Sequence, residues 1–191
     1  VLTMGAMTQN LGNELLAEMA RLKAAGCVGI SNGLSPIKNS VILQRAMAYA
    51  ATLDMTVFIT ASDPWLQSQG CVHEGAVSSR LGLGGIAESA ETVALSRDLI
   101  LIEQTGVRAH FHNLSTGKAV KLIREAQNRG LPVTADVSAH HLHLSEHDLG
   151  NYDALSPVLP PFRSIRDREQ LQQGVRDGVI SAISSHHQPL D

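Results

Sequence analysis

The chain has 191 residues, of which 43% are hydrophobic, so it can bury a sizeable core as one large domain or as part of a larger one. Its 15 Lys and Arg residues against 18 Asp and Glu give a formal net charge of -3, which provides no general attraction to nucleic acid or to an acidic membrane. No apolar stretch reaches the roughly 18 residues of a membrane span, and no basic segment followed by an apolar run begins the chain, so we expect a cytoplasmic protein.

Five helix and strand pairs follow one another along the sequence. The spacing of Leu15, Met19 and Leu22 predicts a first amphipathic helix over residues 12–25, which ends at Gly26. The same alternation of an amphipathic stretch and a short apolar run then recurs four times. The later helices are predicted at 39–53, 87–105, 118–129 and 166–175, and the strands at 27–31, 56–61, 107–112, 132–137 and 179–184.

This alternation predicts a parallel sheet with right-handed crossovers, and polar residues collect just past the carboxyl ends of its strands. They are Asn32, Ser62, Asn113, His140 and His186. A (β/α)8 barrel keeps its site at this end, but a complete barrel takes about 250 residues. The sequence therefore predicts either a partial (β/α)8 barrel of about five units or an open doubly wound sheet. We expect a single domain over 1–191, with the irregular segment 62–85 as a cover of the site.

His110 and His112 lie two residues apart on a predicted strand, which places both imidazoles on one face. One interpretation is a metal pair, because zinc needs three or four converging ligands. The remaining ligands of such a site could come from His140, His141, His186 and His187. The interpretation we favour from spacing alone is a pair of polar strand residues bonded to backbone or water, since no carboxylate accompanies the pair in the sequence.

Two further charged residues need partners. Asp136 lies inside a predicted strand, where a buried carboxylate is either a general base or, as we favour, a structurally paired acid. Arg163 follows the rigid segment Leu159-Pro160-Pro161-Phe162 and precedes a predicted helix. It could hold a carboxylate ligand or pair with Asp167, and the spacing does not decide between them.

Several stretches resemble, in the same order, the dihydroorotase family of the amidohydrolase superfamily. They are A24-A-G-C-V-G-I, D63-P-W-L with V72-H-E-G, S79-R-L-G-L-G-G-I-A-E-S-A-E-T, L131-P-V-T-A-D-V-S-A-H-H-L-H-L, Pro160-Pro161-Phe162-Arg163 and S185-H-H-Q-P-L-D. The resemblance covers essentially all 191 residues. It implies a (β/α)8 barrel that cyclises carbamoyl aspartate reversibly to dihydroorotate in pyrimidine synthesis, with zinc activating water.

The resemblance also implies that the metal site of the family has been lost. Active members open with an H-x-H-x-R strand that supplies two zinc ligands, and this strand would lie before Val1. Where active members read F-S-D-D-G, this chain reads I30-S-N-G-L, so Asn32 and Gly33 stand at the acidic positions. In T60-A-S-D-P, Thr60 replaces a ligand histidine of the H-A-E-D-P motif.

Later motifs of the family differ in the same way. Asn113, in H110-F-H-N-L-S-T, stands where a second ligand histidine is found, and His186 replaces the catalytic aspartate of D-H-A-P-H. Leu159 and Leu190 replace two residues that bind substrate. Because Thr and Asn bind zinc far more weakly than imidazole, and no carboxylate remains at the matched positions, we expect no resident metal or other cofactor.

Within the family, the chain is most similar to the pseudo-dihydroorotases that some bacteria use as non-catalytic partners of aspartate carbamoyltransferase. The resemblance therefore implies a catalytically inactive barrel that holds the carbamoyltransferase chains in a larger complex, with no nucleic-acid or membrane partner. The alternative is an active zinc-dependent dihydroorotase or cyclic amidohydrolase. Its rearranged metal site would consist of His110, His112, His140 and His186.

Overall fold

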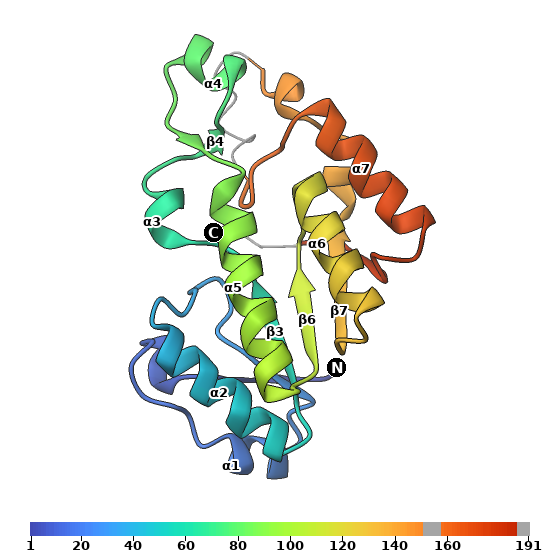
Figure 1. Ribbon diagram of the computed structural model, residues 1–191. Helices are drawn as coiled ribbons and strands as arrows, with labels where there is room; N and C mark the ends of the chain where they lie inside the picture. The colour runs from blue at the N-terminus through green and yellow to red at the C-terminus, as the bar shows by residue number, and fades with distance from the viewer. Residues whose placement is uncertain (151–157, 187–191) are drawn as a thin grey trace.

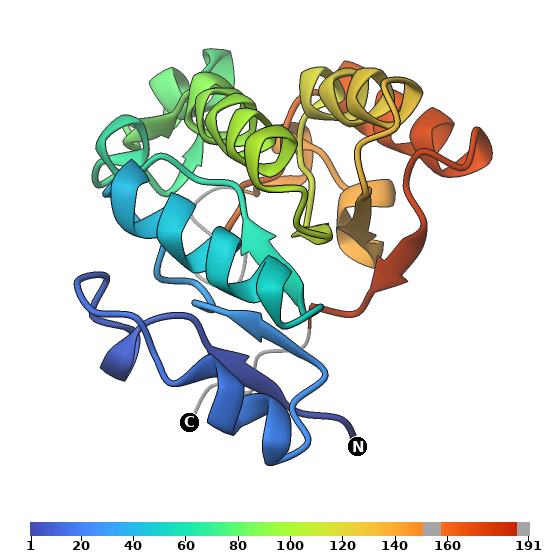
Figure 2. The same cartoon turned by 60° about the horizontal axis from the view of Figure 1, so that its bottom comes forward.

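The computed structural model describes residues 1–150 and 158–186, and a parallel sheet organises them (Figure 1). Its strands are hydrogen-bonded in the order β1-β2-β3-β6-β7-β8. They comprise β1 (Met4–Ala6), β2 (Gly29–Ser31), β3 (Thr56–Thr60), β6 (Ala109–His112), β7 (Val133–Ser138) and β8 (Ala182–Ser184). In Figure 2 the strands follow an arc with the larger helices on its outer side, which is the arrangement of a partial barrel.

Four of the predicted helices are confirmed, with ends that differ by about two residues or fewer. They are α2 (Ser40–Thr52), α5 (Ser89–Thr105), α6 (Gly117–Asn128) and α7 (Ile165–Arg176). Side chains cap three of their amino ends: Asn39 accepts a hydrogen bond from the Val41 N–H, Thr116 caps α6, and Ser164 caps α7. Such caps satisfy backbone donors that a helix leaves unpaired, so they define where each helix begins.

The first predicted helix is wrong over its amino-terminal half, because α1 spans only Met19–Ala24. Residues Gln9–Leu11 form a short 3-10 turn, and Asn13 has a positive φ of 65°. The hydroxyl of Thr8 accepts a hydrogen bond from the Asn13 N–H. Such side-chain bonds to the backbone compete with helix formation, which explains why the apolar spacing around Leu15 was misleading. Strand β1 was also missed, because three residues carry little periodic signal.

The segment 62–85 is not the irregular loop that was expected. It contains α3 (Pro64–Gln67), β4 (Val72–His73) and α4 (Ala76–Leu81), and β5 (Gly85–Ile86) pairs with β4 in a separate two-stranded sheet. A small apolar cluster holds this part of the chain against the segment before α7. Its buried members are Val72, Val77, Leu81, Leu149 and Phe162.

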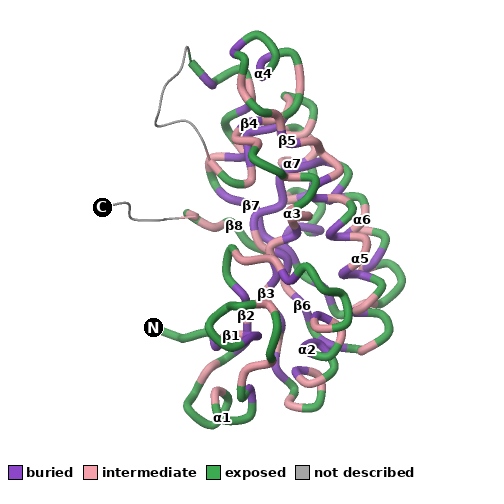
Figure 3. Tube along the Cα trace, turned by 90° about the vertical axis from the view of Figure 1, so that its left-hand side faces the viewer, coloured by how far each residue is buried: buried purple, intermediate pink, exposed green. Residues whose placement is uncertain are grey.

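The main core lies between the sheet and its helices, as the burial pattern in Figure 3 shows. Alternate residues of the central strands, such as Val57 and Phe111, face this core and are completely buried. The residues between them face the concave side of the sheet. Thr60, His110 and His112 lie on this side and are half-buried. Among the described residues, no helix is both long enough and apolar enough to cross a bilayer.

Phe111 is the side chain on which the centre of this core depends, because it is 0% exposed in the middle of β6. We expect Phe111→Ala to lower the free energy of unfolding by about 3–5 kcal/mol, since it removes buried apolar area and leaves a cavity. Urea denaturation measures this loss. Ile100→Ala, at a position of α5 that is 65% exposed, is the matched control and should change stability by about 0.5 kcal/mol or less. Equal losses in the two variants would contradict this assignment of the core.

Candidate active site

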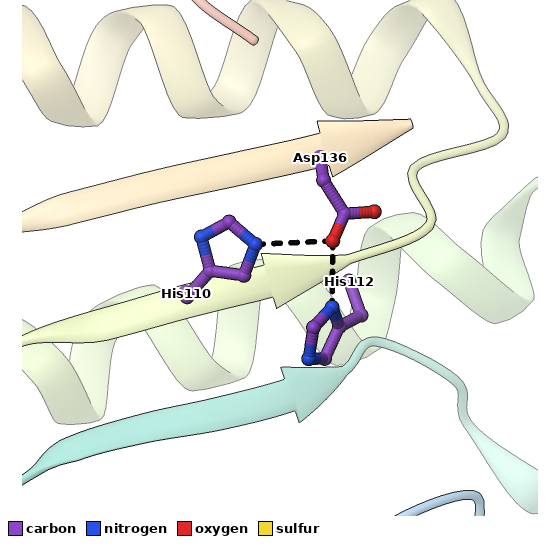
Figure 4. Close-up of side chains that lie close together, drawn as sticks. All are labelled: His110, His112 and Asp136. Atoms are coloured by element: carbon purple, nitrogen blue, oxygen red, sulfur yellow. Dashed lines mark hydrogen bonds and ion pairs between the residues drawn. The ribbon is translucent and has the colours of Figure 1, made fainter. Parts of the chain in front are cut away.

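His110, His112 and Asp136 meet on the concave side of the sheet (Figure 4). The Oδ2 atom of Asp136 lies 3.1 Å from Nε2 of His110 and 2.6 Å from Nδ1 of His112. The expected single face for the two imidazoles is therefore confirmed. The favoured interpretation, in which the pair is bonded to backbone or water, is wrong, because the parallel pairing of β6 with β7 brings Asp136 beside both rings from 24 residues away in the sequence.

Asp136 is a structurally paired acid, as favoured from the sequence. Its other oxygen, Oδ1, accepts a hydrogen bond from the Asn113 N–H at 2.8 Å and faces the Ser184 hydroxyl at 3.4 Å. Burial by itself raises the pKa of this carboxyl, but the hydrogen bonds from His110, His112 and the Asn113 N–H outweigh burial and hold the pKa well below its usual range. Asp136 is therefore a carboxylate at neutral pH, and its contacts connect β7, on which it lies, with β6 and β8.

Asn32, which the resemblance matched to an acid of the family, is 5% exposed. Both atoms of its amide group are hydrogen-bonded to other protein groups. Its Oδ1 accepts hydrogen bonds from the hydroxyl of Thr8 at 2.8 Å and from the Thr8 N–H at 3.3 Å. Its Nδ2 donates to Oδ1 of Asn13 at 2.5 Å and to the Ser35 carbonyl at 3.0 Å. The adjacent Gly33 is exposed and has a φ of +59°. These contacts show a buried amide that serves the fold.

The other matched positions also carry uncharged oxygens. Oδ1 of Asn113 accepts a hydrogen bond from the Ser184 hydroxyl at 3.0 Å. Thr60 ends β3 and lines an open groove together with Asn113, Ser184 and His186. Thr60, Asn113 and His186, which the resemblance matched to ligand and catalytic positions, therefore line one groove at the carboxyl end of the sheet, where Thr60 and Asn113 offer weak metal donors.

His186 lies beside His140, with ring centroids 5.8 Å apart. His140 also packs edge-to-face against Phe162 at 5.4 Å, and its buried Nε2 has no hydrogen-bond partner among the described residues. Burial lowers the pKa of both histidines. The four histidines of the alternative metal site thus form two neighbouring pairs, and the pair on β6 has the Asp136 carboxylate between its rings. Leu190 lies outside the described residues.

Arg163 is 3% exposed and does not pair with Asp167. Its Nε donates to the Ser115 hydroxyl at 3.1 Å, and its Nη1 donates to the Ile86 carbonyl at 2.6 Å. The Ser115 hydroxyl in turn donates to the buried carboxylate of Glu91 at 3.0 Å. Asp167 instead accepts a hydrogen bond from the Ser164 hydroxyl that caps α7.

The sequence reasoning missed Glu91 and Ser115, since nothing local distinguishes an acid in the first turn of a helix from an ordinary surface acid. A cavity of about 80 Å³ lies beside this arrangement. Its lining includes Thr60, Ser62, Gln67, Glu91, Leu159 and Arg163. Leu159, which the resemblance matched to a residue that binds substrate, is an apolar part of the cavity wall.

His141 anchors the segment that carries Arg163. Its Nδ1 lies 2.6 Å from the Ser138 hydroxyl, and its Nε2 lies 3.1 Å from the Pro160 carbonyl. Since Nε2 must donate to a carbonyl, Nδ1 accepts the hydrogen of the serine hydroxyl in the neutral ring. Burial, followed by the nearby His140, lowers the pKa of His141 to about 4.

Comparison with known proteins places this geometry in a family. The family model described as "Dihydro-orotase-like" matches residues 1–119. A "Dihydroorotase-like protein" of Pseudomonas aeruginosa is 48% identical over 189 residues, and one of Pseudomonas putida is 50% identical over 189 residues. The chain belongs to the dihydroorotase-like family. A "Dihydroorotase" of Syntrophobacter fumaroxidans is 41% identical over 189 residues.

These relatives are longer than the chain. The matches cover 99% of the chain but 45% of each Pseudomonas protein and 43% of the Syntrophobacter protein. Among solved structures, the L-hydantoinase (dihydropyrimidinase) of Arthrobacter aurescens superposes with a TM-score of 0.80 at 21% identity, over 97% of the chain and 43% of the hydantoinase. This likeness confirms the predicted partial barrel fold.

The residues at the family positions do not fit a zinc ion. Both the oxygen and the nitrogen of Asn32 are engaged, Asn113 and Thr60 offer only uncharged oxygens, and none of these three supplies the negative charge that offsets a divalent ion. His186 supplies one imidazole, and it stands at a position that the resemblance matches to an acid. We therefore derive no metal-dependent step through these positions.

His141 gives the protein a specific pH dependence. Because an unfolded histidine ionises near pH 6.5 and His141 ionises near pH 4 in the folded chain, the unfolded chain binds the extra proton between these values. Stability therefore falls as the pH falls from about 6.5 to 4. Chemical denaturation at pH 7 and pH 4.5 measures this effect. Between these two pH values, the free energy of unfolding of His141→Gln should fall by about 2 kcal/mol less than that of the wild type. His147→Gln, at an exposed position, should keep the wild-type pH dependence, and parallel curves for all three proteins would contradict the prediction.

The buried Arg163 should stabilise the fold mainly by compensating Glu91. We expect Arg163→Met to lower the free energy of unfolding by about 3–5 kcal/mol, because it leaves a buried acid without its guanidinium. Adding Glu91→Gln to that variant should recover part of the loss, which a double-mutant cycle in urea measures. Arg166→Met, on the exposed first turn of α7, is the control and should be nearly neutral. Strictly additive losses for Arg163 and Glu91 would show that the two residues act independently.

Proposed function

We propose that this chain is a dihydroorotase-like barrel without dihydroorotase activity, which acts in the cytoplasm as a structural partner of aspartate carbamoyltransferase catalytic chains. Neither nucleic acid nor a membrane is a proposed partner, in keeping with the net charge of -3. The relatives support membership of the dihydroorotase-like family, and the weak metal donors at the site support the absence of activity.

The observation that carries this proposal is that both the oxygen and the nitrogen of the Asn32 amide already make two hydrogen bonds each. A metal-binding acid must keep a free oxygen directed at the ion, whereas Asn32 accepts two hydrogen bonds from Thr8 and donates two others. Withdrawing this side chain toward a ligand would leave buried donors and acceptors unpaired, at a cost of about 1–3 kcal/mol for each group. The site is therefore stable in a form that does not hold the metal of the family.

The scaffold around the site is well packed. The sheet and its helices share a continuous core, and Arg163, Ser115 and Glu91 form a buried polar network at the carboxyl end of the strands. A well-packed barrel whose site has weak metal donors favours a role in assembly, because assembly requires the shape of the barrel and not catalytic groups.

A second candidate is a metal-dependent cyclic amidohydrolase with a rearranged site. The observation in its favour is the contact of His110 and His112 with Asp136. Catalysis would also need a base that accepts a proton from water, and the lowered pKa of His186 keeps that imidazole neutral at pH 7. We place this candidate second because the positions that match the substrate-binding residues of the family include the apolar Leu159.

Two measurements on the full-length protein test the proposal. We expect no cyclisation of carbamoyl aspartate above the uncatalysed rate in zinc-supplemented buffer, and we expect the protein to co-elute with aspartate carbamoyltransferase in gel filtration at a size larger than either alone. The carbamoyltransferase mixed with an unrelated barrel protein is the control.

The two results are read separately. Turnover that disappears in His186→Ala would establish the second candidate in place of the first. Absence of both turnover and co-elution would remove the partner while leaving the loss of activity in place.

A further inference from the structure

We propose that His110, His112 and Asp136 form a binding site for a zinc ion that is separate from the positions where the family carries its metal. The site lies on the concave face of β6 and β7 (Figure 4). This proposal does not rest on the loss of dihydroorotase activity, because a bound ion can serve structure as well as chemistry.

The three donor atoms already converge. Nε2 of His110 and Nδ1 of His112 lie 3.1 and 2.6 Å from the same oxygen of Asp136, and all three atoms lie within 4.8 Å of one another. In a tetrahedral zinc site with bonds of about 2.0–2.1 Å, neighbouring ligand atoms are about 3.3 Å apart. Small rotations of the side chains, of about 1 Å at the donor atoms, therefore convert the hydrogen-bonded cluster into a coordination site.

The donor set suits zinc. Two imidazoles and one carboxylate are a combination found in zinc enzymes, and the carboxylate offsets one of the two positive charges. An ordinary carboxyl group is ionised at neutral pH, so this ligand has no proton to lose on binding. When the ion takes the place of the present contacts with Asp136, each neutral imidazole carries its hydrogen on the nitrogen that faces away from the ion, which is Nδ1 of His110 and Nε2 of His112.

Hydrogen bonds outside the cluster orient these donors. Nδ1 of His110 lies 2.7 Å from the Thr134 hydroxyl, which can accept its hydrogen and leave Nε2 free for the ion. The second oxygen of Asp136 is held by the Asn113 N–H and faces the Ser184 hydroxyl. Such outer contacts are what distinguishes a built metal site from a chance group of polar side chains.

Ring packing and access complete the arrangement. Phe58 stacks on the His112 ring, with centroids 5.4 Å apart, and also contacts the His110 ring at 5.5 Å, so both imidazoles are held toward Asp136. His112 and Ser184 line an open groove of about 250 Å³, through which an ion and a water molecule can enter. The site thus has three protein ligands and at least one open position.

The test is titration of the metal-free, full-length protein with Co²⁺, whose visible spectrum reports coordination, followed by competition with Zn²⁺. We expect one Co²⁺ per chain with absorption bands of a four- or five-coordinate ion, displaced by one Zn²⁺. His112→Gln should weaken binding more than about 100-fold, and Thr134→Val about 10-fold. Glutamine retains a hydrogen bond to Asp136, and circular dichroism verifies that each variant is folded.

Two matched variants identify the ligands. His140→Gln, in the neighbouring pair, and His147→Gln, at an exposed position, should bind Co²⁺ as the wild type does. Binding that is lost in His140→Gln but unchanged in His112→Gln would overturn the proposal, because the ion would then sit on the neighbouring pair. Absence of stoichiometric binding in the wild type would overturn it as well, leaving a hydrogen-bonded cluster only.

These outcomes are distinguishable from those of the proposed function. Metal bound at His112 without turnover supports both proposals. Turnover that is lost in His112→Gln supports the metal site and overturns the proposed loss of activity. Co-elution with the carbamoyltransferase in the absence of any bound metal overturns the metal site alone.

Discussion

The carboxylate of Asp136 is the charge around which the carboxyl end of the sheet is arranged. It is buried, and an unpaired charge at such a place would be very costly. Contacts from His110 and His112 on β6, from the Asn113 N–H after that strand and from Ser184 on β8 reduce this cost. Three strands that are far apart in the sequence are thereby joined through one side chain, and the concave face takes its polar character from this requirement.

A second buried charge organises the region around the segment 62–85. Arg163 reaches the Ile86 carbonyl at the end of β5 and, through the Ser115 hydroxyl, the carboxylate of Glu91 on α5. This network connects the small two-stranded sheet to α5 and to the loop after β6 by polar contacts, while the cluster around Phe162 connects that small sheet to the segment before α7 by apolar packing. The site region is therefore held rigidly even though its reactive groups differ from those of the family.

Periodicity made most of the architecture predictable. The apolar spacing placed α2, α6 and α7 to within one residue at each end, and alternation along β6 correctly placed His110 and His112 on one face. The partner of that pair was not predictable, because strand register, which brings Asp136 beside them, is a long-range property. The start of α1 was missed for a related reason, since the bond between Thr8 and Asn13 depends on a turn that no local pattern indicates.

The hydrogen bonds of Asn32 also bear on which residues evolution can place at this position. An aspartate there would replace the Nδ2 donor by an oxygen facing two acceptors, Oδ1 of Asn13 and the Ser35 carbonyl. An acid at this position would thus destabilise the fold unless Asn13 and its surroundings changed first or at the same time. An acidic residue here is therefore reached either through less stable intermediates or by coupled substitutions around one amide.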